Sequence, residues 1–150
     1  MYQAPFLGND WVSDPAVKSP MTLDSPEAAF RRLSDSQLWP VDREAAWLLT
    51  LDTKHRLRRL SLISVGSLGH TFMSPREIMR LALLDNAAAI VVAHNHPSGD
   101  PEPSGDDVAV TRRLSRAGEI VGVELLDHLV LAARQEGGFR FVSLSRRGKL

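Results

Sequence analysis

The chain has 150 residues, 43% of them hydrophobic, which suits one compact domain with a buried core. Lysine and arginine together number 18, as do aspartate and glutamate, so no net charge attracts the protein to nucleic acid or to an acidic membrane. The absence of cysteine excludes disulfides, thiolate catalysis and cysteine-ligated zinc, so a metal site here must use histidine, carboxylates and water.

We expect neither a secretory signal nor a membrane-spanning helix in this sequence. No stretch approaches the roughly 18 consecutive apolar residues of a membrane-spanning helix. The opening residues, MYQAPFLGND, lack the basic start and apolar run of a secretory signal. We therefore expect a cytoplasmic protein that does not enter a membrane, and the sequence indicates no oligomeric state.

The first segment, residues 1–25, contains three prolines and no sustained periodicity, which predicts an irregular N-terminal arm. The remainder, residues 26–150, predicts a single domain. This domain is expected to begin with a helix at SPEAAFRRLSD, because Ser25 suits an N-cap and Pro26 suits the first helical position.

The middle of the chain alternates between strand and helix patterns. The segments EAAWLLTLDT and HRLRRLSLISVGS predict two strands joined by a tight turn at Thr53 and Lys54. SPREIMRLALLDN repeats the serine–proline start and places apolar residues on one helical face. AAAIVVA predicts a short buried strand.

The last third of the chain continues the alternation. Apolar residues at positions 108, 110, 114 and 117 predict a helix that ends at Gly118. VELLDHLVLAA and FRFVSLS predict two further strands. Strands interleaved with helices indicate an α/β domain with a mixed central sheet covered by helices.

The loop HNHPSGDPEPSGDD, which follows the strand AAAIVVA, contains a candidate metal site. His94 and His96 would point to the same side just past the strand end, since residues two apart share a face. Asp107 comes eleven residues after His96, and the loop between them can turn the chain back toward the histidines. Two imidazoles and a carboxylate are typical ligands of a catalytic zinc, with the fourth position left for water.

Each part of this loop also has an interpretation without a metal. A His-x-His pair by itself is more common at a surface or in a hydrogen-bonded core than as a ligand pair. Ser104 and Asp107 could form only a capping box at the start of a helix. We leave both interpretations of Ser104 open, but the coincidence of all these parts within fourteen residues favours a metal site.

These residues resemble a known family. The spacing of His94, His96, Ser104 and Asp107 matches the motif of the JAMM metalloproteases, also called JAB or MPN+ domains, and AHNHPSGDPEPSGDD looks most like the RadC-type branch. The resemblance implies a cytidine-deaminase-like JAB/MPN fold and a zinc ion (Zn2+) held by His94, His96 and Asp107. It also implies that Ser104 polarises the scissile carbonyl or binds the zinc water.

The resemblance further implies a glutamate general base in a Glu-x-x-x-Leu-Leu context, which REAAWLLTL supplies at Glu44. Without the resemblance, Glu44 would be interpreted as an exposed carboxylate at a strand edge. Glu77 is the rival candidate, because SPREIMR puts it in the first turn of a helix just before the metal strand. The favourable interaction of a carboxylate with a helix N-terminus already explains Glu77, so we assign the base to Glu44.

The implied function is that of a zinc-dependent metallopeptidase that cleaves peptide or isopeptide bonds through an activated water. Its expected substrate is an extended peptide or the tail of a ubiquitin-like protein. The alternative is a DNA-repair-associated or mobile-element accessory factor of the RadC type, acting on DNA or binding it. The net charge of zero does not favour binding to nucleic acid, and a strand face exposed to solvent explains the basic run KHRLRR. A metal-free binding module is disfavoured because every ligand type is present.

The remaining polar residues of interest are assigned as follows. His128, in the apolar strand LLDHLVL, is predicted to be a satisfied core histidine and not a ligand. His55 and His70 have polar neighbours and are predicted to face solvent. Asn95 and Asp100 either shape the loop around the metal or only form turns, and the sequence does not choose between these roles.

Overall fold

The computed structural model describes residues 12–13, 21–36, 43–66 and 73–150. Most of the predicted arm over 1–25, and the histidine at position 70, lie outside these residues. Strands and helices alternate along the chain in the order β1 (Val12–Ser13), α1 (Pro26–Ser34), β2 (Ala45–Leu51), β3 (Leu57–Val65), α2 (Pro75–Leu84), β4 (Ala89–Asn95), α3 (Gly105–Val121), β5 (Glu124–Ala133) and β6 (Phe139–Ser143).

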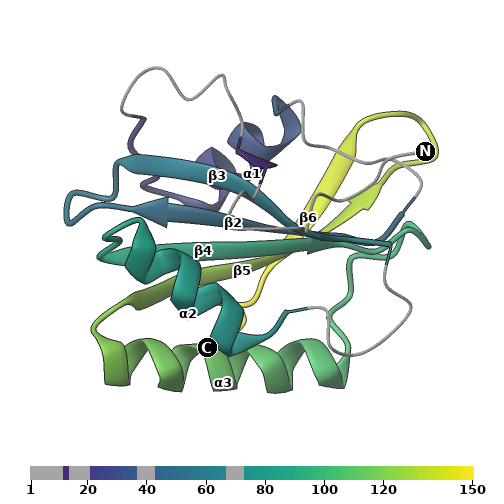
Figure 1. Ribbon diagram of the computed structural model, residues 1–150. Helices are drawn as coiled ribbons and strands as arrows, with labels where there is room; N and C mark the ends of the chain where they lie inside the picture. The colour runs from purple at the N-terminus through teal and green to yellow at the C-terminus, as the bar shows by residue number, and fades with distance from the viewer. Residues whose placement is uncertain (1–11, 14–20, 37–42, 67–72) are drawn as a thin grey trace.

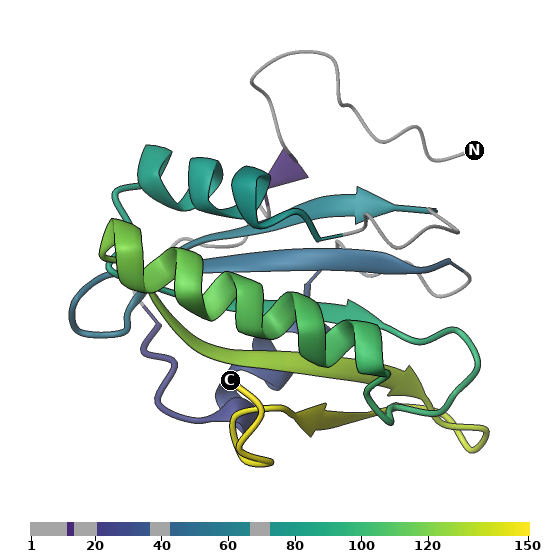
Figure 2. The same cartoon turned by 90° about the horizontal axis from the view of Figure 1, so that it is seen from below.

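The described strands form one six-stranded sheet in the order β1-β3-β2-β4-β5-β6. β4 and β5 pair in parallel, and all other neighbours pair antiparallel. α1 lies on one face of the sheet, while α2 and α3 lie side by side on the other (Figures 1 and 2). This arrangement confirms the predicted α/β class with a mixed sheet covered by helices. None of the helices in the described ranges has the length and apolar character needed to cross a lipid bilayer.

The predicted hairpin between β2 and β3 is present, with its turn at Thr53 and Lys54. The carboxylate of Asp52 stabilises this turn by accepting hydrogen bonds from the backbone N–H groups of Lys54 and Arg56, at 2.8 and 2.9 Å. His55 adopts a left-handed backbone conformation in the turn, with φ of 56°. Its side chain is partly exposed, in line with the prediction from its polar neighbours.

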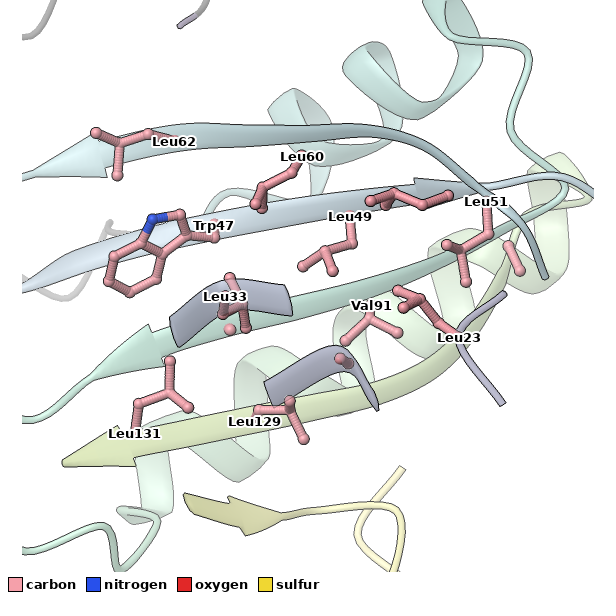
Figure 3. Close-up of a cluster of buried hydrophobic side chains, with 14 of the residues drawn as sticks. Leu23, Leu33, Trp47, Leu49, Leu51, Leu60, Leu62, Val91, Leu129 and Leu131 are labelled. Carbon is pink, nitrogen blue, oxygen red and sulfur yellow. The ribbon is translucent and has the colours of Figure 1, made fainter. Parts of the chain in front are cut away.

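Side chains alternate between the two faces along the central strands, because successive residues of a strand point in opposite directions. Trp47 and Leu49 of β2 face α1 and pack with Leu33 of that helix (Figure 3). Ala46 and Leu48 face α2 and α3. The sheet therefore separates two hydrophobic clusters, and the second cluster contains Ile78 and Met79 of α2, Leu114 of α3, and Ile90 and Val92 of β4.

The end of α3 differs from the prediction. The helix does not end at Gly118 but continues to Val121, and its cap is Gly122, whose φ of 79° is left-handed. A Cβ atom at Gly118 would collide with the carbonyl oxygen of Val123, so this glycine permits the close approach of the following strand. Both glycines are therefore required, one for packing and the other for the backbone turn that ends the helix.

Candidate metal centre

The two histidines lie at the carboxyl end of β4, an inner strand of the sheet. We had predicted that both histidines lie just past the strand end. The strand instead extends through Asn95, so His94 lies within it and only His96 lies past its end. His94 pairs with Ala46 of β2 and with Val130 of β5, and its side chain is 2% exposed. His96 follows directly, and its backbone N–H donates to the carbonyl of Leu131 at 2.7 Å. Neighbouring strands on both sides thus restrain the backbone that carries the histidines.

The start of α3 brings Asp107 to the histidines. Ser104 is the N-cap, and its Oγ accepts a hydrogen bond from the Asp107 N–H at 3.1 Å. The Asp107 carboxylate in turn accepts from the Ser104 N–H at 2.8 Å, which completes the predicted capping box. This reciprocal pair fixes the carboxylate, whose oxygens lie 3.1 Å from His94 Nε2 and 3.3 Å from His96 Nε2.

The three side chains have the spacing and chemistry of a metal site. His94 Nε2 and His96 Nε2 are 3.0 Å apart, and they lie 3.1 and 3.3 Å from the two different oxygens of the Asp107 carboxylate. Tetrahedral zinc with bonds of about 2.0 Å needs ligand atoms about 3.3 Å apart. His94, His96 and Asp107 form the one such cluster of three potential ligands found in the described part of the chain. They could therefore hold a divalent metal ion.

Electrostatic interactions within the group favour a cation. Burial raises the pKa of Asp107, but the adjacent rings of His94 and His96 lower it more strongly, so this pKa lies far below its ordinary range. The hydrogen bond to Asp107 raises the pKa of His96 against the opposing effect of burial. The carboxylate is therefore ionised at neutral pH and stabilises positive charge beside it.

The Nδ1 atoms of both histidines contact partners behind the site. His96 Nδ1 donates to the carbonyl oxygen of Asp100 at 2.9 Å, so the backbone of Asp100 shapes the loop around the site. His94 Nδ1 lies 2.7 Å from Nε2 of His128. His128 is fully buried, as predicted for a core histidine, and burial lowers its pKa well below the ordinary value. Its ring is therefore neutral at pH 7.

The sheet register relates Glu44 to the histidines. Ala46 lies opposite His94 in the antiparallel pair of β2 and β4. Continuing this register by two residues sets Glu44 opposite His96, with its side chain on the same face. The charge of Glu44 contributes to the raised pKa of His96. Glu44 is half-buried and is not a member of the three-ligand cluster.

Asn95 holds the backbone on both sides of Glu44. Its Oδ1 accepts from the N–H of Ala45 at 2.6 Å, and its Nδ2 donates to the carbonyl of Arg43 at 2.8 Å. The Asn95 side chain is 5% exposed. Sequence reasoning missed this role, because the partners of Asn95 lie about 50 residues away along the chain.

The rival glutamate has a local explanation. Glu77 is exposed on the first turn of α2 and forms an ion pair with Arg80, three residues later, at 3.0 Å. Register and charge therefore relate Glu44 to the histidines, whereas Glu77 is explained by its pairing on α2.

Comparison with known proteins identifies relatives over most of the chain. A family model described as RadC-like JAB domain matches residues 23–149. The chain is 41% identical over 138 residues to a UPF0758 protein of Desulfitobacterium hafniense (strain DSM 10664 / DCB-2), which covers 92% of this chain and 57% of that protein. It is 43% identical over 141 residues to UPF0758 protein COPRO5265_1522 of Coprothermobacter proteolyticus, covering 94% and 57%. The chain thus spans little more than half the length of these relatives.

Proposed function

The chain belongs to the RadC-like JAB domain family, and from this premise we propose that it is a zinc-dependent hydrolase of peptide or isopeptide bonds. The observation that carries the proposal is the convergence of His94 Nε2, His96 Nε2 and the Asp107 carboxylate within 3.0–3.3 Å of one another. Two neutral imidazoles and one carboxylate form a ligand set typical of catalytic zinc, with one position left for water.

The positions of the residues suggest separate catalytic roles for the metal ion and for Glu44. Zinc held by these ligands would lower the pKa of water toward neutrality and polarise a carbonyl. Glu44 lies on the same face of the sheet, outside the ligand cluster, so its carboxylate is available to accept a proton from the attacking water. The same carboxyl group can then deliver this proton to the leaving amine. No covalent intermediate with the protein is required.

We assign Ser104 a second role beside its capping interaction. Its Oγ accepts from the Asp107 N–H, so the cap uses a lone pair of the hydroxyl and not its proton. Ser104 is exposed at the N-terminus of α3, next to the ligand Asp107. Its O–H can therefore donate a hydrogen bond to the oxyanion that develops on the scissile carbonyl.

The proposed substrate is an extended peptide, for example the tail of a ubiquitin-like protein. The equal numbers of basic and acidic residues provide no electrostatic attraction for the phosphate backbone of nucleic acid. We therefore favour a peptide substrate over DNA, and the test below includes both.

The test is an activity screen of the zinc-loaded protein against fluorogenic peptides, isopeptide-linked ubiquitin-like probes, and single- and double-stranded DNA. We expect cleavage of an amide bond that a chelator abolishes and added zinc restores. Cleavage of DNA alone, or amide cleavage that survives complete removal of the metal, would contradict the proposal.

A further inference from the structure

A chain of buried hydrogen bonds leads away from the metal centre and returns to it. His94 Nδ1 lies 2.7 Å from His128 Nε2, and His128 Nδ1 lies 2.6 Å from the Oγ1 of Thr111. Thr111 Oγ1 is 2.6 Å from the backbone carbonyl of Asp107. The side chains of Thr111 and His128 are fully buried. The chain thus begins at one ligand residue and ends on the backbone of another.

The end of this chain determines where its protons lie. A carbonyl oxygen only accepts, so the Thr111 O–H donates to the Asp107 carbonyl and Thr111 Oγ1 accepts from His128. His128 therefore carries its proton on Nδ1, and its bare Nε2 accepts from His94 Nδ1. Each of the three short contacts therefore contains one proton. In each contact, the donor is the group nearer to His94 along the chain of hydrogen bonds, and the acceptor is the group nearer to the Asp107 carbonyl.

The same assignment of protons determines the tautomer of the His94 ring. With its proton on Nδ1, a neutral His94 has a lone pair on Nε2, the atom that faces His96 and Asp107. The reverse arrangement would put two acceptors, Thr111 Oγ1 and the Asp107 carbonyl, 2.6 Å apart with no proton between them.

We propose that His128 and Thr111 are positioning residues that hold His94 in the Nδ1–H tautomer and direct its Nε2 lone pair to a divalent metal ion. This inference rests on the metal site of the proposed function but not on its peptide substrate. Partners of this kind behind a ligating histidine fix the orientation of its ring and raise its basicity, and their loss typically weakens metal binding by about 10–100-fold.

A purely structural role is the competing explanation. A threonine within a helix often bonds to the carbonyl four residues earlier, and a buried histidine needs partners in any core. Under that explanation, removing the Thr111 hydroxyl would lower the stability of the fold but would not change the affinity for metal. The two explanations therefore differ in a measurement that does not depend on activity.

The test replaces Thr111 by valine, which keeps the shape and removes the hydroxyl, and measures the zinc affinity by competition with a chromophoric chelator. We expect the affinity of Thr111→Val to fall by about 10–100-fold and that of Thr111→Ser to stay near the unchanged protein. Thr50→Val is the matched control. Thr50 is also a buried threonine, but it bonds to Asp85 at 2.9 Å and pairs with Ile90, four residues before His94.

A second measurement keeps the inference testable if Thr111→Val folds poorly. The ¹⁵N and ¹H NMR signals of the histidine rings in the unchanged protein should show Nδ1 of His94 and Nδ1 of His128 protonated, with and without zinc. A His94 ring with a bare Nδ1 would overturn the inference. So would equal zinc affinities for Thr111→Val, Thr50→Val and the unchanged protein, or no zinc binding at all. Zinc binding without amide hydrolysis would instead contradict the proposed function alone.

Discussion

Asp127 and His128 are adjacent in sequence, but their side chains lie on opposite faces of the sheet. On the α1 side, the Asp127 carboxylate accepts from the N–H groups of His128 and Ser145 and from the hydroxyl of Ser143, at 2.7, 3.0 and 2.6 Å. On the α3 side, the His128 ring contacts His94 of the candidate metal centre at 2.7 Å. The Asp127 carboxylate is surrounded by hydrogen-bond donors. At His94, His96 and Asp107, by contrast, several atoms that can accept hydrogen bonds lie close together.

The comparison separates two uses of buried polar groups. A carboxylate whose oxygens face hydrogen-bond donors is satisfied by the fold, so its loss should reduce stability. Lone pairs that converge from His94, His96 and Asp107 can be satisfied together by a cation, so their loss should reduce metal binding and activity. Substitutions on the two faces of the sheet should therefore have different effects on metal binding and on stability.

The largest effect is expected from the ligands themselves. The purified protein should contain about one zinc ion per chain, and His94→Ala or His96→Ala should lose most of it together with all turnover. Elemental analysis and a thermal melt of each metal-free protein would provide the measurement. A folded protein that takes up no zinc after supplementation would contradict the assignment of the metal centre.

The next largest effect is expected at Glu44. Glu44→Gln keeps the shape of the side chain and removes its basicity, so zinc content should persist while hydrolysis slows by about 10²-fold or more. Glu77→Gln is the matched control and should change stability slightly and turnover little, since Glu77 pairs with Arg80 on an exposed helix face. An active Glu44→Gln together with an inactive Glu77→Gln would reverse our assignment.

Ser104 is expected to affect both rate and stability. Ser104→Ala should lower the free energy of unfolding by about 0.5–2 kcal/mol through loss of the cap, and should slow turnover by roughly 10²-fold. Ser25→Ala removes the corresponding cap of α1, where Ser25 Oγ accepts from the Ala28 N–H at 3.2 Å. It should lower stability similarly without slowing turnover per folded molecule. Equal rates for both variants would remove Ser104 from the catalytic site.

The smallest effect on the metal centre is expected from the other face of the sheet. Asp127→Ala leaves the donors from Ser143, Ser145 and His128 without their acceptor, which should lower the free energy of unfolding by about 1–3 kcal/mol. The folded protein should still bind zinc with unchanged stoichiometry, as measured by elemental analysis after chemical denaturation establishes the stability. Loss of zinc from a folded Asp127→Ala protein would show that the two faces are not independent.

Much of the fold could be predicted because its signals are local. The serine–proline starts of α1 and α2, the hairpin turn at Thr53 and Lys54, and the alternation of the strands all depend on residues within a few positions of one another. The prediction that α3 ends at Gly118 was wrong because it, too, rested on local signals alone. Gly118 and Gly122 look alike locally, and only the approach of Val123 to Gly118 shows which of them is inside the helix.

The features of the candidate site that could be predicted also depend on local signals. The placement of His94 and His96 on one face could be predicted from the sequence, because strand residues two apart point the same way. So could the capping box of Ser104 and Asp107, whose partners are three residues apart. Thr111 could have been added, since it lies one helical turn beyond Asp107 and shares its face.

The distant residues that lie near the histidines could not be predicted from the sequence, because the pairing of the strands places them there. Glu44, about 50 residues before His94, is brought to the same end of the sheet because β2 pairs antiparallel with β4 in the observed register. His128, 34 residues after His94, contacts that histidine because β5 pairs with β4 in parallel. The pattern within a strand specifies which face each side chain occupies, but not which strand lies beside it or in what register. That choice depends on burying both faces of the whole sheet at once, and no short segment contains this information.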